Sequence, residues 1–309
     1  MHAAVVNSWA EGPRCTTVDN PPPPSDDQLQ LRVMGAGLHQ LVRSRAKGQH
    51  YSASQLPHTA GVDGIGKDEA TGKLYYFANM RPDFGSFVEY VNVDKRMLVA
   101  LPDGADPVAF AAGVNPAMSS WMAITQRTSN LPENYTVLIV GATSASGKIA
   151  VSVARELGAG RVIGVARNAA ALEKVQGLDE RIVQKDPVTE TDFSQVDCDV
   201  ILDYIYGDVT AHLLSTIPAK RPIQYVQIGS MAQVQASLSA FLFRSKDITL
   251  RGSGPGAFPV TAMGPEMTKM IPKMIGWDLP EAAAVPLKDL ETAWDDKELA
   301  KKGRIVFTP

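Results

Sequence analysis

Cysteine is scarce in this sequence, which has only two in 309 residues. Cys15 and Cys198 lie far apart along the chain and in different predicted domains, so we expect no disulfide between them. Two cysteines are too few for a four-cysteine structural zinc site, and the five histidines do not show the spacing of metal ligands. The sequence therefore predicts a protein without a metal site.

Charge of one sign and long apolar runs are lacking as well. The 30 basic and 33 acidic residues leave a formal net charge of -3, without a long run of either sign. No apolar stretch is long enough to span a membrane, and the first residues lack the basic start and apolar core of a signal peptide. We therefore expect a cytoplasmic protein that binds neither nucleic acid nor a membrane.

The chain is long enough for two domains, with 45% hydrophobic residues to fill their cores. Its most informative stretch, residues 136–168, predicts a strand, a tight turn, a helix and a second strand in succession. Val137–Val140 is an uninterrupted run of β-branched and aliphatic residues, as in a central parallel strand. The helical pattern that begins at Gly147 ends at Gly158, and Arg161–Ala166 is the next strand. This order is typical of the βαβ unit of a dinucleotide-binding fold.

The turn of this unit carries small residues in a modified glycine pattern. The usual fingerprint is G-x-G-x-x-G, whereas here Gly141, Ser144 and Gly147 follow one another at spacings of three, with Ala150 after them. Small residues still stand wherever the backbone must approach a phosphate. We expect the N–H groups of this turn to bind a pyrophosphate, with hydroxyl donors from Ser144 and Ser146. A turn that binds no nucleotide is the alternative.

The end of the second strand indicates which nucleotide binds. An Asp or Glu at this position accepts the ribose hydroxyls of NAD and would repel a 2′-phosphate. This chain has Arg167-Asn168 there and no acid before Glu173. Because a guanidinium matches a phosphate in shape and charge, the sequence favours NADPH as the cofactor. A solvated surface arginine is the alternative interpretation.

The two ends of the chain differ in pattern from its middle. The first hundred residues predict short strands and loops, interrupted by the stiff run Pro21–Pro24. Gly61–Gly66 has three glycines in six residues and predicts a tight turn between strands. Residues 107–126 are alanine-rich and helical, with Asn115 at the expected hinge between domains. The last strand, Gly303–Phe307, returns to the β-rich pattern of the start, so we expect it to fold back onto the first domain.

The remaining strands are short in the first part of the chain and alternate with helices in the middle, as in a parallel sheet. Further helices are expected near Gly264–Ile275 and at Leu287–Asp295. The other expected strands are Ala3–Asn7, Leu29–Met34, Lys73–Asn79, Gly85–Val93, Met97–Leu101, Arg181–Val183, Val200–Tyr204, Ile223–Ile228 and Ile248–Gly252.

This order of parts resembles the zinc-independent quinone oxidoreductases of the medium-chain dehydrogenase/reductase superfamily. The resemblance spans nearly the whole chain and implies an α/β fold, with a Rossmann doubly wound parallel sheet inserted in a GroES-like β-barrel domain. The implied GroES-like catalytic domain comprises residues 1–114 and 260–309, and the Rossmann NADP-binding domain comprises residues 115–259. The motifs that carry the resemblance are Gly48–Tyr51, Leu56-Pro57, Gly61–Gly64, Phe84–Phe87, Gly141–Ala150, Arg167-Asn168, Asp199–Asp203, Ile228–Ser230 and Gly303–Val306.

The resemblance also implies NADPH as hydride donor and a homodimer. We expect the strand at Ile248–Arg251 to lie at the edge of the sheet and to pair with its twofold mate. Zinc-dependent relatives carry a His-Glu pair where this chain has Val62-Asp63, which agrees with the absence of a metal site. The expected cofactor-binding residues are Ser144, Ala145, Ser146, Gly147, Arg167, Asn168, Lys185, Gly229 and Ser230.

Two departures from the family pattern concern the expected site. Many quinone reductases have Asn and, three residues on, Asp where this chain has His39 and Val42. Family members often place a tyrosine near the 2′-phosphate, where this chain has Gln184-Lys185. The first departure leaves the substrate open, and the second leaves Arg167, helped by Lys185, to hold the phosphate.

Hydride transfer to a quinone or an enone needs a hydrogen-bond donor on the carbonyl oxygen, where negative charge develops. Tyr51 is the first candidate, because it lies in the loop expected at the cleft between the domains. His39 and His50 are second candidates, and Asn115 could orient the nicotinamide carboxamide or the substrate. The alternatives are a tyrosine that only fills the domain seam and histidines that are satisfied polar residues.

Three classes of function follow from this reading of the residues. The leading one is an NADPH-dependent reductase of quinones or α,β-unsaturated carbonyls, which could serve a biosynthetic pathway. The second is a redox-neutral cyclase or isomerase on the same fold. The third is a non-catalytic NADPH-binding protein. The sequence does not name the acceptor, because specificity depends on the shape of loops near residues 39–58 and 253–265.

Overall fold

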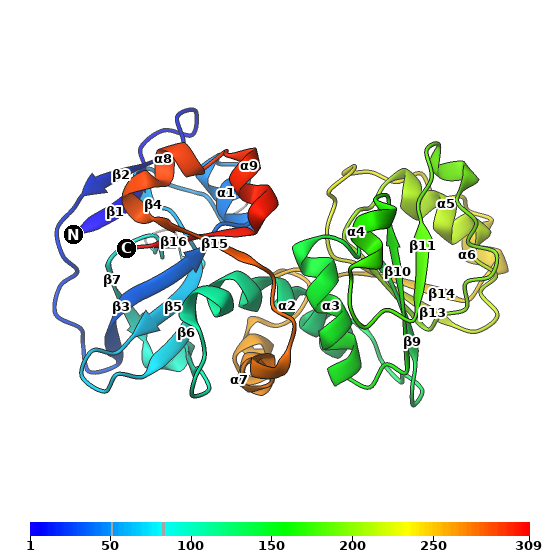
Figure 1. Ribbon diagram of the computed structural model, residues 1–309, viewed down its shortest axis with the longest axis horizontal. Coiled ribbons are helices and arrows are strands. Elements are labelled where there is room, and N and C mark those ends of the chain that lie inside the picture. The colour runs from blue at the N-terminus through cyan, green and yellow to red at the C-terminus, as the bar shows by residue number, and fades with distance from the viewer. Residues whose placement is uncertain (51, 82–83) are drawn as a thin grey trace. The chain divides into compact units, whose positions relative to one another are not determined.

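The computed structural model describes residues 1–50, 52–81 and 84–309, apart from the side chain of Val260. The chain forms two compact units (Figure 1). One comprises Met1–Asn115 and Met267–Pro309, and the other, Pro116–Glu266, is inserted between these two segments. The sequence predicts the corresponding boundaries at 114/115 and 259/260.

The first unit is built from short and mostly antiparallel strands. One sheet has the order β2-β1-β4, and a larger sheet has the order β15-β16-β3-β5-β6-β8, with β7 paired to β3. In the larger sheet β15 and β16 run parallel to each other. The strands of this unit are β1 His2–Val6, β2 Pro13–Thr17, β3 Gln28–Gly37, β4 His58–Thr59, β5 Asp63–Lys67, β6 Leu74–Ala78, β7 Tyr90–Asp94, β8 Leu98–Ala100, β15 Ala282–Pro286 and β16 Arg304–Thr308.

The core of the first unit follows from the period-2 pattern of its strands. In β3, Leu31 and Val33 are buried, whereas Arg32 between them is exposed. Aromatic rings from distant parts of the chain meet in the same core, where Phe87 contacts Phe307 edge to face with ring centroids 5.1 Å apart. Burial of these side chains is the main favourable contribution to folding of this unit.

The prediction of a tight turn at Gly61–Gly66 is wrong. Residues Asp63–Lys67 form strand β5, which pairs with both β3 and β6. A Cβ atom at Gly66 would lie 2.7 Å from the Cβ atom of Leu31, so glycine allows the neighbouring strand β3 to pack closely on β5. The glycines therefore serve close packing within a strand, and Asp63 is carried into the interior by that strand.

Helix α2, Pro107–Arg127, confirms the long helix predicted at residues 107–126. Pro116 lies inside it and has no N–H group to donate to the carbonyl four residues earlier. The boundary between the two units falls at this residue, directly after Asn115.

The remaining helices are short. Among the described residues, no helix combines the length and the hydropathy needed to cross a membrane. The helices are α1 Gln40–Ala46, α3 Ala145–Glu156, α4 Ala169–Glu173, α5 Asp208–Thr216, α6 Leu242–Ser245, α7 Met263–Met270, α8 Leu290–Ala293 and α9 Lys297–Lys302, with 3₁₀ segments at Lys95–Met97, Val188–Glu190, Val260–Ala262, Ile271–Gly276 and Leu287–Asp289.

The second unit contains a parallel sheet with the order β11-β10-β9-β12-β13-β14. Numbered within the unit, this order is 3-2-1-4-5-6, the order of the doubly wound dinucleotide-binding fold. All of β9 is buried, as the uninterrupted apolar run predicts. The predicted Rossmann sheet is therefore confirmed. Its strands are β9 Thr136–Val140, β10 Arg161–Ala166, β11 Glu180–Val183, β12 Val200–Asp203, β13 Ile223–Gln227 and β14 Ile248–Gly252.

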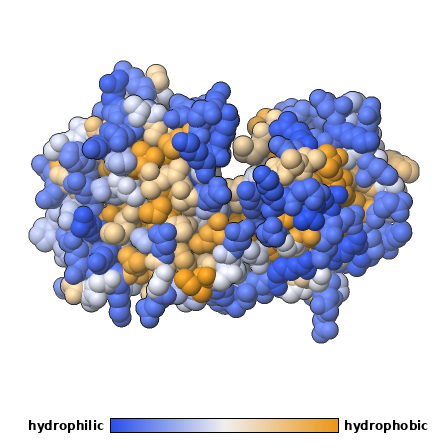
Figure 2. Space-filling view, in the orientation of Figure 1, coloured by the Kyte–Doolittle hydropathy of each residue, from blue (hydrophilic) through white to orange (hydrophobic). Residues whose placement is uncertain are grey.

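Helices cover both faces of this sheet (Figure 1). α5 and α6 bring Val209, Leu213 and Leu242 into a core cluster with side chains of β9 and β10. α3 and α4 lie on the other side of the strands. The visible face of this unit is mostly hydrophilic, with apolar residues in smaller groups (Figure 2).

Candidate active site

The turn from β9 to α3 brings the start of the helix against the end of the strand. Gly141 has a φ of 94°, a conformation that favours glycine. A Cβ atom at Gly147 would lie 2.2 Å from the carbonyl oxygen of Gly141, which no side chain could tolerate. The two glycines therefore hold the first turn of α3 close to the carboxyl end of β9, where a dinucleotide-binding fold receives its pyrophosphate.

Ser144 caps helix α3 with its hydroxyl group. The hydroxyl oxygen accepts a hydrogen bond from the N–H of Gly147 at 3.0 Å and donates to the carbonyl oxygen of Gly141 at 2.8 Å. Its proton already has an acceptor, so the hydroxyl does not point a free donor at a phosphate as the sequence suggests. Ala145 and Ser146 open the helix, and their N–H groups have no intrahelical partner. These two N–H groups are the better candidates for anion binding.

Arg167 and Lys185 follow the carboxyl ends of two neighbouring parallel strands. Ala166 of β10 is in register with Val183 of β11, and the side chains of Arg167 and Lys185 are both exposed. The side chain of Asn168 instead accepts a hydrogen bond from the N–H of Ala171 at 3.0 Å and caps α4. The carboxyl ends of β10 and β11 are therefore followed by two exposed cations, Arg167 and Lys185, whereas the side chain of Asn168 caps α4.

The two cations differ in their surroundings. Hydrogen bonds from Ser194 and, to a smaller extent, the charge of Lys185 lower the pKa of the Asp192 carboxyl. Lys185 therefore faces a carboxylate of its own unit. Among the described residues, Arg167 forms no ion pair in this structure, so its guanidinium group is the more available of the two for an anionic ligand.

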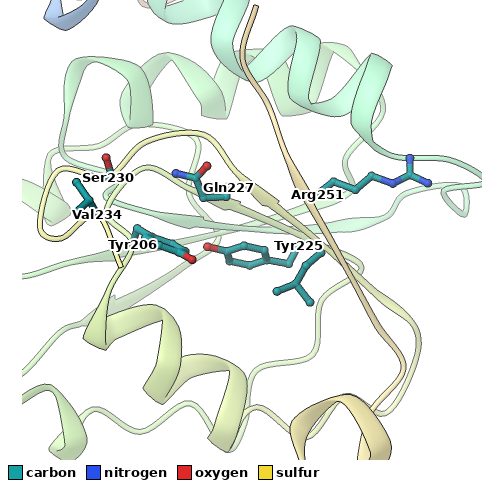
Figure 3. A pocket seen from close by; sticks show the side chains of 7 residues that line it. Tyr206, Tyr225, Gln227, Ser230, Val234 and Arg251 are labelled. Atoms are coloured by element: carbon teal, nitrogen blue, oxygen red, sulfur yellow. The ribbon is translucent and has the colours of Figure 1, made fainter. Parts of the chain in front are cut away.

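Gly229 and Ser230 lie just beyond β13. The N–H of Gly229 donates to the carbonyl oxygen of Asp203 at 3.1 Å, and a Cβ atom at Gly229 would lie 2.7 Å from the carbonyl oxygen of Tyr204. Ser230 lines a cavity of about 360 Å³ together with Tyr206 and with residues of β13 and β14. Figure 3 shows the hydroxyl groups of Tyr206 and Tyr225 pointing toward one another in this cavity.

Asp203, the last residue of β12, belongs to the motif Asp199–Asp203, for which the sequence predicts no binding or catalytic role. Its side chain is fully buried and accepts hydrogen bonds from the N–H groups of Ile205 and Tyr206, at 2.8 and 2.9 Å, and from the hydroxyl of Tyr225 at 2.8 Å. The hydroxyl of Thr210 donates to it as well. Burial, followed by the charge of Asp203, raises the pKa of Tyr225. The one available signal was an acid that directly follows an apolar strand.

In the first unit, His39 forms a buried pair with Asp63. His39 Nε2 lies 2.8 Å from Asp63 Oδ1, and each side chain is only 5% exposed. The hydroxyl of Tyr76, on β6, donates to Asp63 Oδ2 at 3.3 Å. Burial, and after it the charge of Asp63, raises the pKa of Tyr76 well above its usual range. Tyr76 is therefore neutral and acts as a hydrogen-bond donor to the carboxylate.

Arg304 lies within electrostatic reach of Asp63 and contacts Asn115. Its Nη2 donates to Asn115 Oδ1 at 3.3 Å, while its buried Nε has no hydrogen-bond partner among the described residues. Burial lowers the pKa of Arg304 to about 10, although the negative charge of Asp63 acts in the opposite direction. We define His39, Asp63, Tyr76, Arg304 and Asn115 as the Asp63 cluster. Two of the predicted catalytic residues, His39 and Asn115, thus belong to one polar cluster, which Asp63 and Arg304 complete.

The remaining candidates are His50 and Tyr51. His50 Nδ1 lies 2.8 Å from the hydroxyl oxygen of Ser52, and burial followed by the charge of Arg45 lowers its pKa. Tyr51 lies outside the described residues. Within the part of the chain that the structure describes, no group of three or more His, Cys, Asp or Glu side chains could hold a metal ion.

Comparison with known proteins identifies the family. No protein-family model matches the chain. A curated relative, the probable NADPH-dependent quinone reductase tdiC of Emericella nidulans, is 35% identical over an alignment that covers all of both chains. Among solved structures, the quinone oxidoreductase of Thermus thermophilus matches with a TM-score of 0.81 and 20% identity over all of both chains.

A second solved structure supports the same fold. An alcohol dehydrogenase superfamily protein of Novosphingobium aromaticivorans matches with a TM-score of 0.82 and 19% identity, over 100% of this chain and 99% of its own. The solved structures establish the fold, and the curated relative establishes the kinship in sequence. The chain belongs to the quinone oxidoreductases of the medium-chain dehydrogenase/reductase superfamily.

Proposed function

We propose that this protein is an NADPH-dependent reductase that transfers hydride to a quinone or a related enone. The observation that carries the proposal is the exposed Arg167 at the carboxyl end of β10, where NAD-binding versions of the fold have an acid. The name of the curated relative, a probable NADPH-dependent quinone reductase, agrees with it. The Thermus quinone oxidoreductase of similar fold was also solved in complex with NADPH.

The residues of the second unit fit the cofactor. The close approach at Gly147 and the N–H groups of Ala145 and Ser146 suit a pyrophosphate, because they offer donors without a side chain in the way. The guanidinium of Arg167 suits the 2′-phosphate, with Lys185 as a weaker second cation. When bound, NADPH would supply the hydride.

The acceptor must gain a proton as well as a hydride. Reduction of a quinone adds two electrons and one proton as hydride, and the oxygen that then carries negative charge takes a second proton. We propose that the Asp63 cluster in the first unit serves this part of the reaction, since it contains both His39 and Asn115. Tyr51 remains a candidate donor on the grounds of its sequence position alone.

A direct assay tests the proposed function. Purified protein is mixed with NADPH and a panel of quinones and enones, and loss of the reduced nicotinamide absorbance is followed. We expect oxidation with at least one acceptor, and NADPH should be preferred to NADH. If no acceptor oxidises NADPH, product analysis without cofactor distinguishes a redox-neutral enzyme from a non-catalytic NADPH-binding protein.

We also propose that the protein forms a homodimer through β14. This strand lies at the end of the sheet order, and its outer side has no partner strand among the described residues. The segment that precedes it exposes large apolar side chains, including Phe241 at 68% and Phe243 at 50%. Pairing of β14 with its twofold mate would satisfy the free backbone groups. Light scattering should give twice the 33.2 kDa mass of the chain, and the monomer mass at micromolar concentrations would contradict the proposal.

A further inference from the structure

The buried pair in the Asp63 cluster defines which nitrogen of His39 carries a proton. His39 Nε2 lies 2.8 Å from Asp63 Oδ1, and water has little access to either side chain. An ionised carboxylate only accepts hydrogen bonds, so Nε2 must be the protonated nitrogen of a neutral imidazole. Nδ1 is then an acceptor in the neutral ring and a donor in the charged ring.

The carboxylate of Asp63 has two further polar neighbours. The hydroxyl of Tyr76 donates to its second oxygen at 3.3 Å, and the positive charge of Arg304 lies within electrostatic reach. Both interactions stabilise the negative charge against the cost of its burial. β5 fixes the position of the carboxylate, since it pairs with β3 on one side and β6 on the other.

The backbone position of His39 gives an independent argument. His39 is the N-cap residue of α1, with extended φ and ψ angles of -132° and 173°, but its side chain makes no hydrogen bond to the helix. Ser, Thr, Asp or Asn at this position would cap the helix with a side-chain hydrogen bond. The imidazole instead turns to Asp63, so this position forgoes a helix cap in favour of the buried pair.

We propose that Asp63 is a positioning residue that fixes His39 as the proton donor to the reduced acceptor. This inference rests on the proposed reductase function. After hydride has added to the acceptor, the bond between Nδ1 and its proton breaks, and that proton forms a new O–H bond on the acceptor oxygen. The ring becomes neutral and keeps its Nε2–H bond to Asp63, and Nδ1 must regain a proton, derived ultimately from solvent, before the next turnover. No oxidant or reductant beyond NADPH and the acceptor is required.

A double-mutant cycle tests whether Asp63 acts through His39. The variants are Asp63→Asn, His39→Asn and the double variant, and His39→Asn introduces the residue that many family members have. We expect each single change to lower kcat by about tenfold or more, and the double variant to be no slower than His39→Asn. NADPH affinity should change by less than about twofold. A double variant that loses the product of both effects, or an Asp63→Asn variant with normal kcat, would overturn the proposal.

The tautomer of His39 provides a readout that does not depend on turnover. In the ¹⁵N-labelled protein, nuclear magnetic resonance should show the neutral ring protonated at Nε2, and Tyr76→Phe should keep this tautomer as a matched control. Asp63→Asn should lose the preference for the Nε2-protonated tautomer, because the amide of Asn can donate a hydrogen bond to Nε2 as well as accept one from it. Protonation at Nδ1 in the unmodified protein would overturn the proposal, even if Asp63→Asn does not fold. If the protein oxidises no NADPH with any acceptor, the proposed function fails while the tautomer measurement still decides the role of Asp63.

Discussion

Each unit of this molecule buries an aspartate in a polar cluster, and the two clusters differ in the partners of the carboxylate. Asp203 in the second unit accepts from two backbone N–H groups and from two neutral hydroxyls. Asp63 in the first unit has an imidazole and a phenol as hydrogen-bond partners, with a guanidinium nearby. Both carboxylates accept from a tyrosine hydroxyl, so the difference is that backbone N–H groups fix a turn at Asp203, whereas the imidazole at Asp63 can carry a proton. The comparison predicts a mainly structural role for Asp203 and a mainly chemical role for Asp63.

Asp203→Ala should have the largest effect on stability. The change leaves two buried hydroxyls and two part-buried N–H groups without their acceptor, and each unsatisfied buried group costs about 1–3 kcal/mol. We expect the free energy of unfolding to fall by about 3 kcal/mol or more, measured by urea denaturation. Asp247→Ala, which removes an exposed carboxylate from the same unit, is the control. A loss of less than about 1 kcal/mol at Asp203 would remove the distinction between the two clusters.

Arg167→Ala should have the next largest effect, on cofactor binding instead of folding. A complete pair between phosphate and guanidinium is worth about 1.5–3 kcal/mol, so the Kd for NADPH should rise roughly tenfold or more. The Kd for NADH should hardly change, and titration calorimetry measures both. Lys174→Ala removes an exposed cation from the end of α4 and should leave both affinities as they are. Equal Kd values for the two cofactors in the unmodified protein would refute the assignment.

Ser144→Ala separates helix capping from phosphate binding in the second unit. Loss of an N-cap hydroxyl typically costs about 1 kcal/mol of stability, and we expect that loss in urea denaturation. NADPH affinity should fall by less than about threefold, because the hydroxyl proton already has an acceptor at Gly141. A tenfold loss of affinity with unchanged stability would mean that the hydroxyl turns to the phosphate when the cofactor binds.

The smallest effect should be a pH dependence of stability from the first unit. Burial, followed by the charge of Arg45, lowers the pKa of His58 from its usual value of 6.5. The unfolded chain then binds more protons than the folded one as the pH falls through this range, so stability decreases toward acid. Each unit of pKa difference is worth about 1.4 kcal/mol, and we expect a loss of that size or less between pH 7 and pH 5. In the His58→Gln variant, the free energy of unfolding should depend less on pH. If its slope against pH is unchanged, other groups cause the dependence.

The sequence predicted the second unit more completely than the first. Arg161–Ala166 has the predicted bounds, because a nearly uninterrupted apolar run marks a buried parallel strand. The half-exposed edge strand Ile248–Gly252 also has its predicted bounds. In the first unit β2 and β15 were missed, and the strand predicted at Gly85–Val93 begins only at Tyr90. Edge and half-exposed strands carry a weaker pattern, and their pairing depends on residues distant in the chain.

The candidate site shows the same limit. Small residues at the β9–α3 turn and Arg167 at the end of β10 could be recognised locally, since their chemistry depends on neighbours in sequence. The pair of His39 and Asp63 could not, because it forms only once Asp63 lies in a strand that the glycine pattern concealed. Arg304 reaches Asn115 across 189 positions of the chain, and no local pattern predicts that contact.

The insertion of one unit within the other has a consequence for the order of folding during synthesis. β3 pairs with β16, which follows the inserted unit in the chain and is therefore synthesised after it. The inserted unit, Pro116–Glu266, contains all strands of its own sheet in one continuous segment. It can therefore complete its sheet while the first unit still waits for its closing strands. Residues Met1–Asn115 must remain soluble with an open sheet edge during that interval, which makes them the part of the nascent chain most exposed to misassembly.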